Sequence, residues 1–380
     1  MTRSLKDSLA AVASRFHPYE LITEIDALGS GNINDTFLVT INEQGTSQNF
    51  VMQRLNTDVF NRPDLVMQNM IALGNHVQKR IDISPRTLRG RRWEMPTVVS
   101  ARDSKHWVEH EGQFWRTITY IGAATTSNVI NDSFHAKEVG YGLGMFHNLI
   151  NDLPLNELVD TLEDFHITPT YMRHYDLALK DPRIRTNSTH KLNSRISKAM
   201  DFVEKNRKGI NVLELALANG ELQKRPIHGD PKINNVMMDD STGHAIGLID
   251  LDTVRPGLVH YDIGDCLRSC CNRAGEESED INEVFFDIEL CRAILEGYLS
   301  VAGSFLKNND YFYIPDCIRL IPFELGLRFL TDHLKGNTYF KTSRPDHNLD
   351  RAEIQFRLTE SIENQMPDII SLVNNLTPTT

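Results

Sequence analysis

One segment of the chain, residues 227–252, limits what the protein can fold into more than any other. It reads IHGDPKINNVMMDDSTGHAIGLIDLD and carries polar residues on both sides of a predicted tight hairpin. Polar groups packed this densely among apolar residues are costly to bury unless they bind one another, a metal or a substrate. The segment therefore predicts a functional site. Its candidate residues are His228, Asp230, Asn234, Asn235, Asp250 and Asp252.

The order and spacing of these residues favour phosphoryl transfer. That reaction needs a carboxylate to orient and deprotonate the acceptor hydroxyl, and metal ligands to hold Mg²⁺ on the phosphates. In protein kinases a loop H-R-D-x-x-x-x-N precedes two short strands, after which the metal-binding Asp arrives. Here His228, Asp230 and Asn235 keep that spacing, and two predicted strands would bring Asp250 back to them. Asp252 is either a second metal ligand or a cap of the next loop.

A glycine-rich turn lies near the N-terminus. A dinucleotide fingerprint would require a helix after such a turn, whereas residues 36–40 here predict a strand. This order favours a loop that folds over nucleotide phosphates, where missing side chains let backbone N–H groups approach the oxygens. The turn consists of Gly29, Ser30, Gly31, Asn32, Ile33 and Asn34.

The chain changes character at about residue 120. Before it, β-branched and aromatic runs predict a small antiparallel sheet with one helix, which begins at Pro63. Beyond it, apolar residues recur mostly at helical spacing. We therefore predict an α+β, bilobal fold, with a nucleotide-binding lobe at 1–120 and a mainly helical catalytic and substrate-binding lobe at 121–380. After the glycine-rich turn, strands are expected at 36–40, 50–55, 97–99, 107–108, 114–121, 236–238 and 246–249, and helices at 63–79, 134–149, 192–205, 285–299, 321–334 and 353–373.

Composition narrows the class of ligand. Nucleic-acid binders usually carry a cluster of positive charge. This chain has a net charge of −11 and no long Lys/Arg run, so we expect a small-molecule ligand instead. No apolar run approaches the ~20 residues that span a bilayer. Charges at Lys6 and Asp7 interrupt the region where a signal peptide needs an apolar core. Five cysteines without paired spacing predict reduced, buried thiols, and with them a cytoplasmic protein.

Taken together, these stretches resemble the aminoglycoside phosphotransferase and choline kinase superfamily, whose fold is protein-kinase-like with a small sheet lobe and a large helical lobe. Nearly the whole chain is similar to one of its subgroups, the bacterial N-acetylhexosamine 1-kinases. The resemblance is carried by LGSGNINDTFLVT, FVMQRLNTDVF, HGDPKINNVMMD, GLIDLDTVRPGLVHYDIGDCLRS and GLRFLTDHLKGNTYFKTSRPDHNLDRAEIQ. The last stretch lies far outside the catalytic core and favours this subgroup.

The resemblance implies ATP- and Mg²⁺-dependent phosphorylation of the anomeric hydroxyl of a hexose or N-acetylhexosamine, giving a sugar 1-phosphate. Asp230 would be the catalytic base and His228 would brace its loop, while Asn235 and Asp250 would hold the metal. Asp262 matches the residue that supports this loop from below. The nucleotide would contact Gly29, Ser30, Gly31, Asn32 and Gln53, and the sugar would contact Asp230, Asp250, Asn32, Arg328 and Tyr339.

Some positions depart from the pattern. Kinases place a Lys on the third strand and pair it with a Glu on the first helix, but that strand position is Gln53 and the helix from Pro63 contains no Glu. Phosphate anchoring is then left to the glycine-rich turn, the metal, and Arg54 or Arg268. Because this Lys–Glu ion pair is missing, a nucleotide-binding pseudokinase is a further alternative. Asn32 stands where hexosamine kinases often have His, so sugar specificity has shifted if that side chain touches the sugar.

Two alternatives concern the acceptor. Arg328 lies among apolar residues of a predicted helix and is either a ligand of hydroxyl groups or a structural partner of Glu324 or Asp332. The acceptor itself is either an anomeric hydroxyl or a hydroxyl of the aminoglycoside, choline or homoserine type. Choline would call for an aromatic cage and aminoglycosides for a cluster of carboxylates, whereas Arg328 at the acceptor site argues against a cationic substrate.

Overall fold

The computed structural model describes residues 3–29, 33–182 and 194–378. The chain forms two compact units, neither of which is continuous in sequence. The first contains residues 1–124, 152–162 and 249–256, and the second contains residues 125–151, 163–248 and 257–380. A division at residue 120 therefore misses two returning segments, one of which carries Asp250.

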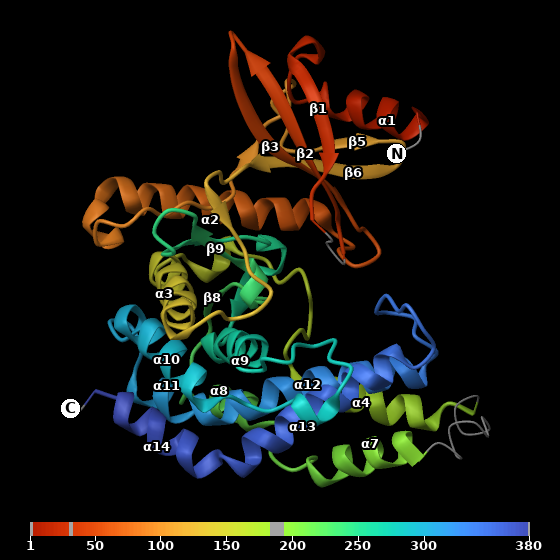
Figure 1. Cartoon of the computed structure of the whole chain (residues 1–380), viewed down its shortest axis with the longest axis vertical. Coiled ribbons are helices and arrows are strands. Elements are labelled where there is room, and N and C mark those ends of the chain that lie inside the picture. The colour runs from red at the N-terminus through yellow and green to blue at the C-terminus, as the bar shows by residue number, and fades with distance from the viewer. Residues whose placement is uncertain (1–2, 30–32, 183–193, 379–380) are drawn as a thin grey trace. The chain divides into compact units, whose positions relative to one another are not determined.

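The first unit is built on an antiparallel sheet of six strands (Figure 1). Its strand order is β1-β2-β3-β6-β4, with β5 also paired to β6. The register places Gln53 of β3 opposite Arg116 of β6. The bounds are β1 Ile22–Ala27, β2 Asp35–Glu43, β3 Thr46–Leu55, β4 Val98–Val99, β5 Val108–His110 and β6 Gln113–Thr119. Strand β7, Ala124–Thr125, belongs instead to the three-stranded sheet of order β10-β9-β7.

Two helices accompany this sheet, of which the sequence predicted only α2 (Pro63–Ile83). The other, α1 (Arg3–Ala13), contributes Leu9 and Val12 to the cluster that buries Phe50 of the sheet. A helix of this length is marginal by itself and gains its stability from packing. The single-helix prediction was wrong because that packing is not visible in the local pattern.

The second unit is mostly helical, and its α3 and α10 pack unusually closely. A Cβ atom at Gly140 of α3 would lie 1.9 Å from the carbonyl oxygen of Ile294, and one at Gly297 of α10 would lie 1.9 Å from that of Lys137. Only glycine permits this approach. The helices are α3 Ser133–Ile150, α4 Thr168–Lys180, α7 Ser194–Lys205, α8 Val212–Ala218, α9 Val259–Cys270, α10 Ile288–Ala302, α11 Asn308–Phe312, α12 Ile314–Leu334, α13 His347–Asn364 and α14 Met366–Leu376; the strands are β8 Arg225–Ile227, β9 Val236–Asp239, β10 Ala245–Leu248 and β11 Arg255–Gly257.

The predicted hairpin is present. Strands β9 and β10 pair antiparallel, with Val236 opposite Leu248. In the turn between them, Asp239 Oδ1 accepts the N–H groups of Ser241 and Thr242, both at 3.0 Å. The long helix predicted at 353–373 is instead two helices, because the chain breaks at Gln365 ahead of a proline in the first turn of α14.

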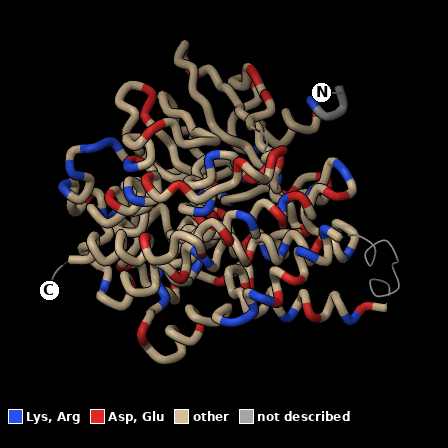
Figure 2. Tube along the Cα trace, turned by 60° about the horizontal axis from the view of Figure 1, so that its bottom comes forward, with Lys and Arg blue, Asp and Glu red and all other residues tan. Residues whose placement is uncertain are grey.

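Charged residues of both signs are distributed along the chain. Figure 2 shows acidic and basic residues interspersed along the trace of the chain. All five cysteines are buried free thiols, which confirms the prediction made from their spacing. Among the described helices, none combines the length and the apolar character that crossing a bilayer requires.

Candidate active site

The loop after β8 brings two predicted catalytic residues together. A 3₁₀ turn at Ile233–Asn235 bends the chain so that Asn235 Nδ2 donates to the carbonyl oxygen of Asp230, at 2.7 Å. The Nζ atom of Lys232 lies 2.8 Å from Asp230 Oδ2. A cation therefore stands beside the carboxylate that would accept the hydroxyl proton. Sequence reasoning missed Lys232, although its place two residues after Asp230 was a signal.

The backbone of this loop is held from α9 by a buried carboxylate. Asp262 Oδ2 accepts the N–H of His228 at 2.7 Å, and Oδ1 accepts that of Gly229 at 2.8 Å. His147 Nε2 also donates to Asp262 Oδ2, at 2.8 Å. Burial alone would raise the pKa of Asp262, but the His147 hydrogen bond and the neighbouring donors lower it overall. His228 is fully buried, and its Nδ1 accepts the N–H of Asp230 at 3.2 Å.

The predicted metal ligand Asp250 belongs to the first unit and has a strained backbone. Its φ and ψ of 63° and 58° lie in the left-handed region, which costs a non-glycine residue about 1 kcal/mol or more. Asp252 follows in the next turn and is 2% exposed. Its Oδ2 accepts from Asn34 Nδ2 at 2.7 Å, and its Oδ1 lies 2.6 Å from Arg116 Nη1. Oδ1 faces the Arg116 charge but accepts no hydrogen bond from the described residues, so ion pairing is a third role beside the two left open by the sequence.

At the strand position where kinases carry a lysine, Gln53 is hydrogen-bonded to Arg116. Gln53 Oε1 accepts from Arg116 Nε at 2.9 Å and from Nη2 at 2.7 Å, while Gln53 Nε2 donates to Thr36 Oγ1 at 3.1 Å. The buried cation thus comes from the adjacent strand, β6. Its carboxylate partner, Asp252, comes from the segment of Asp250 rather than from a helix. Strand register alone revealed Gln53, but not this partner.

The two arginines considered for phosphate anchoring are engaged elsewhere. Arg54 Nε donates to Asp35 Oδ2 at 2.8 Å near the surface of the sheet. Arg268 is 4% exposed and pairs with Asp265 at 2.7 Å and also with Glu276. Each guanidinium therefore already has a carboxylate partner.

The glycine-rich turn is described only in part. Gly29 has a φ of +71°, which glycine adopts without strain. Asn34 Oδ1 accepts the N–H of Asn56 at 3.0 Å, so this residue ties the end of the turn to the segment after β3. The contacts predicted for Ser30, Gly31 and Asn32 lie outside the described residues and stay predictions.

The donor chemistry at the predicted metal ligands fits Mg²⁺. Asn235 uses its Nδ2 to donate to Asp230, which leaves Oδ1 as its acceptor atom for a cation. Asp250 adds a carboxylate, and Mg²⁺ prefers such hard oxygen ligands together with phosphate oxygens. The described residues contain no group of three His, Cys, Asp or Glu side chains suited to a metal. A site completed by nucleotide phosphates needs no such group, but Asn235 and Asp250 lie in different units and their pairing stays a prediction.

The predicted acceptor residue Arg328, on α12, is half-buried among aromatic rings. Its guanidinium carbon lies 4.9–5.5 Å from three ring centroids, a geometry that stabilises a cation. Neither Glu324 nor Asp332 forms an ion pair with it, and its N–H groups find no acceptor in the described part of the chain. Neither carboxylate is thus a direct ion-pair partner, but the charge of Glu324 helps to raise the pKa of the guanidinium, and the choice between the two roles stays a prediction. The rings are those of Phe165, Tyr171 and Phe340.

Asp332 organises the loop that follows α12. Its carboxylate accepts three successive backbone N–H groups, those of residues 338–340, at 2.8–3.0 Å. Asn348 Nδ2 donates to the same carboxylate at 2.9 Å. These bonds fix the backbone that presents Phe340 to the guanidinium. The side chain of Tyr339 is 60% exposed, with its ring 4.8 Å from that of Phe340.

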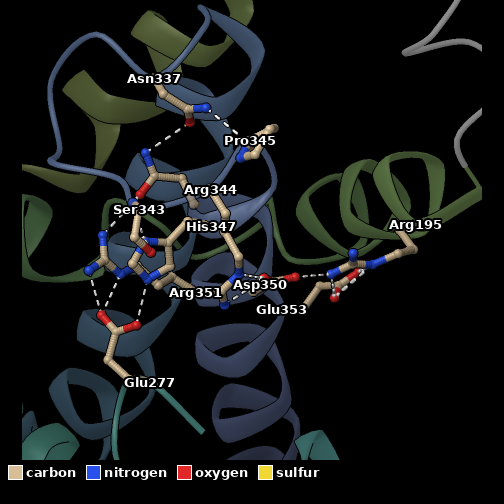
Figure 3. Close-up of polar contacts among 11 residues, drawn as sticks. Arg195, Glu277, Asn337, Ser343, Arg344, Pro345, His347, Asp350, Arg351 and Glu353 are labelled. Carbon is tan, nitrogen blue, oxygen red and sulfur yellow. Dashed lines mark hydrogen bonds and ion pairs between the residues drawn. The ribbon is translucent and has the colours of Figure 1, made fainter. Parts of the chain in front are cut away.

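Figure 3 shows how the same loop is attached to the start of α13. The N–H of Ser343 donates to His347 Nδ1 at 3.2 Å, and Arg344 Nη2 donates to Asp350 Oδ2 at 2.9 Å. Arg351 forms an ion pair with Glu277, which also lies 2.6 Å from His347 Nε2. The loop is thus held at both ends.

Comparisons with known proteins agree with this fold. A choline kinase structure from Cryptosporidium parvum Iowa II has a TM-score of 0.58 at 14% identity, covering 97% of this chain and 99% of that one. An aminoglycoside phosphotransferase structure from Alicyclobacillus acidocaldarius subsp. acidocaldarius DSM 446 has a TM-score of 0.57 at 14% identity, covering 96% of each chain. An ethanolamine kinase structure from Plasmodium vivax has a TM-score of 0.51 at 14% identity, covering 88% and 82%.

The sequence itself matches the family described as "Phosphotransferase enzyme family" over residues 24–298. This match and the shared fold confirm the predicted α+β, kinase-like architecture and the predicted superfamily of aminoglycoside phosphotransferases and choline kinases. They also confirm the predicted enzyme class, a small-molecule kinase. The chain belongs to the phosphotransferase enzyme family.

Proposed function

We propose that this protein is an ATP- and Mg²⁺-dependent anomeric kinase, which phosphorylates the C1 hydroxyl of a hexose or an N-acetylhexosamine. The observation that carries the proposal is the loop HGDPKINN, in which Asn235 and Lys232 both contact Asp230. Such a carboxylate can orient a hydroxyl and accept its proton.

In the proposed reaction, Asp230 takes the proton of the C1 hydroxyl. The sugar oxygen forms a bond with the γ-phosphorus, and the bond between that phosphorus and the bridging oxygen breaks, which releases ADP. An anomeric hydroxyl is more acidic than an ordinary alcohol, so a carboxylate suffices as base. Asn235 and Asp250 would hold Mg²⁺, which supplies positive charge to the phosphate oxygens when bound. Lys232 would keep the carboxylate of Asp230 oriented.

The surroundings of Arg328 support a polar, uncharged or anionic acceptor. Its guanidinium donors have no acceptor among the described residues, and aromatic faces surround it. A cationic acceptor such as choline or an aminoglycoside would meet like charge there. Sugar hydroxyls, in contrast, can accept hydrogen bonds from the guanidinium. Asn32 and Tyr339 remain proposed sugar contacts.

The second candidate is a kinase for a hydroxyl that is not anomeric. It is supported by the common fold with a choline kinase, an ethanolamine kinase and an aminoglycoside phosphotransferase. A pseudokinase is less well supported, because Asp230, Asn235 and Asp250 are all present. We also infer a cytoplasmic location, since all five cysteines are free thiols, which persist in a reducing compartment.

The test measures ATP consumption with Mg²⁺ against N-acetylglucosamine, N-acetylgalactosamine, glucose and galactose, each repeated with its 1-O-methyl glycoside. We expect turnover with at least one free sugar and none with its glycoside, because methylation removes the acceptor hydroxyl. Turnover that survives methylation would move the acceptor to another hydroxyl. If no sugar supports ATP consumption but choline, homoserine or an aminoglycoside does, the second candidate would be established instead.

A further inference from the structure

A buried histidine contacts the catalytic loop in addition to the aspartate that braces it. His166 is 4% exposed, and its Nε2 lies 2.9 Å from the carbonyl oxygen of Gly229. That carbonyl belongs to the peptide bond leading into Asp230. Since a carbonyl oxygen only accepts, Nε2 must carry the proton and donate it. The bond therefore fixes the plane of the peptide from which Asp230 projects.

The other ring nitrogen faces a buried carboxyl group. His166 Nδ1 lies 3.1 Å from Glu324 Oε1, and the hydroxyl of Thr168 donates to Glu324 Oε2 at 2.7 Å. Two acceptor atoms cannot approach this closely without a proton between them. The pair therefore shares a proton, which locks the orientation of the ring with Nε2 towards the loop. The ring of Tyr261 stacks on it at 5.6 Å.

The backbone that carries this histidine is strained. Asp164 and His166 have φ values of 63° and 62°, in the left-handed region that residues other than glycine rarely adopt. Such strain persists only where surrounding contacts over-determine it, and it concentrates at functional sites. Between the two strained residues, Phe165 presents its ring to Arg328, with 5.1 Å between the guanidinium carbon and the ring centroid. One short segment thus touches both the catalytic loop and the proposed acceptor site.

We propose that His166 is a positioning residue. It holds the Gly229 carbonyl so that the carboxylate of Asp230 is aligned with the hydroxyl of an acceptor bound at Arg328. This inference rests on the proposed function for its acceptor, and it adds a residue that neither the motif nor the resemblance indicates. His166 acts through the loop, since its bond is to Gly229 rather than to a reacting group. The strained segment thus supports both the catalytic loop and an aromatic ring that contacts Arg328.

Two variants of equal length test the hydrogen bond. His166→Gln keeps a donor near the place of Nε2, whereas His166→Met has a similar shape without a donor, and both carry the same penalty for left-handed backbone. With N-acetylglucosamine, or the panel sugar that turns over fastest, we expect His166→Met to lower kcat by about 10- to 100-fold. His166→Gln should stay within about threefold of the wild type, with the KM for ATP unchanged in both. Equal kcat values for the two variants would overturn the proposal.

A second measurement does not depend on the acceptor. In the full-length protein with ¹⁵N-labelled histidine, NMR should show a protonated Nε2 at pH 7.5 in the signal that disappears on His166→Gln. Glu324→Gln should alter the Nδ1 signal of the same ring. An unprotonated Nε2 would overturn the inference even if every sugar is a substrate. Absence of sugar turnover with a protonated Nε2 would instead count against the proposed function alone.

Discussion

Arg116 Nη1 lies 2.6 Å from Asp252 Oδ1, and each of these side chains is only 1% exposed. The pair connects strand β6 to the segment that carries Asp250, and Asn34 and Gln53 add hydrogen bonds at either end. Removing one member leaves the other buried and uncompensated, which costs about 3–5 kcal/mol. We therefore expect Arg116→Gln or Asp252→Asn alone to lower the free energy of unfolding strongly in urea titrations.

The combined Arg116→Gln/Asp252→Asn variant tests whether Asp252 acts as an ion-pair partner of Arg116 or as a metal ligand. It should recover a large part of the lost stability, because no buried charge is left unpaired. It should also keep Mg²⁺-dependent ADP binding by calorimetry, since Asp252 already pairs with Arg116 and accepts a hydrogen bond from Asn34. Arg15→Gln is the matched control, because its pair with Asp103 is exposed and such pairs contribute little. Loss of the Mg²⁺ dependence in the double variant would show that Asp252 is a metal ligand after all.

Asp230→Asn should abolish turnover and leave nucleotide binding nearly intact. The carboxylate would lose its basicity, which is worth about 10²–10⁴-fold in rate, while the bond from Asn235 to the backbone carbonyl of Asp230 would remain. ATP consumption with sugar and calorimetry with ADP measure the two effects. The control is Asp240→Asn, an exposed carboxylate in the hairpin turn of the same segment. A large loss of ADP affinity in Asp230→Asn would contradict the assigned role.

Arg328→Lys should raise the KM for the acceptor by about tenfold or more and leave the KM for ATP unchanged. Lysine keeps the charge but loses the planar group that stacks between rings and donates in a fixed geometry. Steady-state kinetics with each substrate varied in turn distinguish the two constants. Arg357→Lys, at an exposed i,i+3 pair with Glu360 on α13, serves as control. A rise confined to the KM for ATP would place Arg328 outside the acceptor site.

Asp332→Asn should loosen the loop that presents Phe340 to Arg328. An amide offers one acceptor oxygen where the carboxylate now accepts three backbone N–H groups and the side chain of Asn348. Hydrogen exchange followed by mass spectrometry should become faster at residues 338–340. The control Asp346→Asn changes an exposed carboxylate in the same loop. Unchanged exchange at these residues would show that the other end of the loop suffices to hold it.

The sequence predicted the parts of this site that depend on local order. The spacing of His228, Asp230 and Asn235, followed by a hairpin, indicated the loop and phosphoryl transfer, while the fold class came from the strand and helix patterns and the family resemblance. The partners of these residues come from elsewhere in the chain. His147 reaches Asp262 across 115 positions, and no pattern of apolar residues encodes such a distance.

Left-handed backbone also escaped prediction. Asp164 and His166 are not glycines, and neither precedes a turn signal of the usual kind. Their conformation is set by tertiary contacts, such as the bond from His166 to Gly229. The sequence also did not reveal that Arg116 and Asp252 replace the Lys–Glu ion pair of kinases, for a related reason. Gln53 could be placed by strand register, but Arg116 became its partner only through the pairing of β3 with β6.

Glu214 should make the stability of the protein fall as the pH rises from about 4.5 to about 7. Burial raises the pKa of this carboxyl from 4.5 to about 7, against the opposing hydrogen bond from the Tyr261 hydroxyl at 3.0 Å. In this window the folded state keeps a proton that the unfolded state releases, so unfolding is favoured by each rise in pH. The loss is on the order of 2 kcal/mol, because partial exposure reduces the full effect of the shift.

Glu214→Gln removes this contribution, since the amide does not titrate and its oxygen can still accept from Tyr261. Relative to the wild type, the variant should therefore gain stability between pH 5 and pH 8, measured by urea unfolding at several pH values. Glu283→Gln, an exposed carboxyl in the same unit, should show no such gain. A constant difference between Glu214→Gln and the wild type across this range would mean that Glu214 has the same proton affinity folded and unfolded, and that its burial is relieved by water.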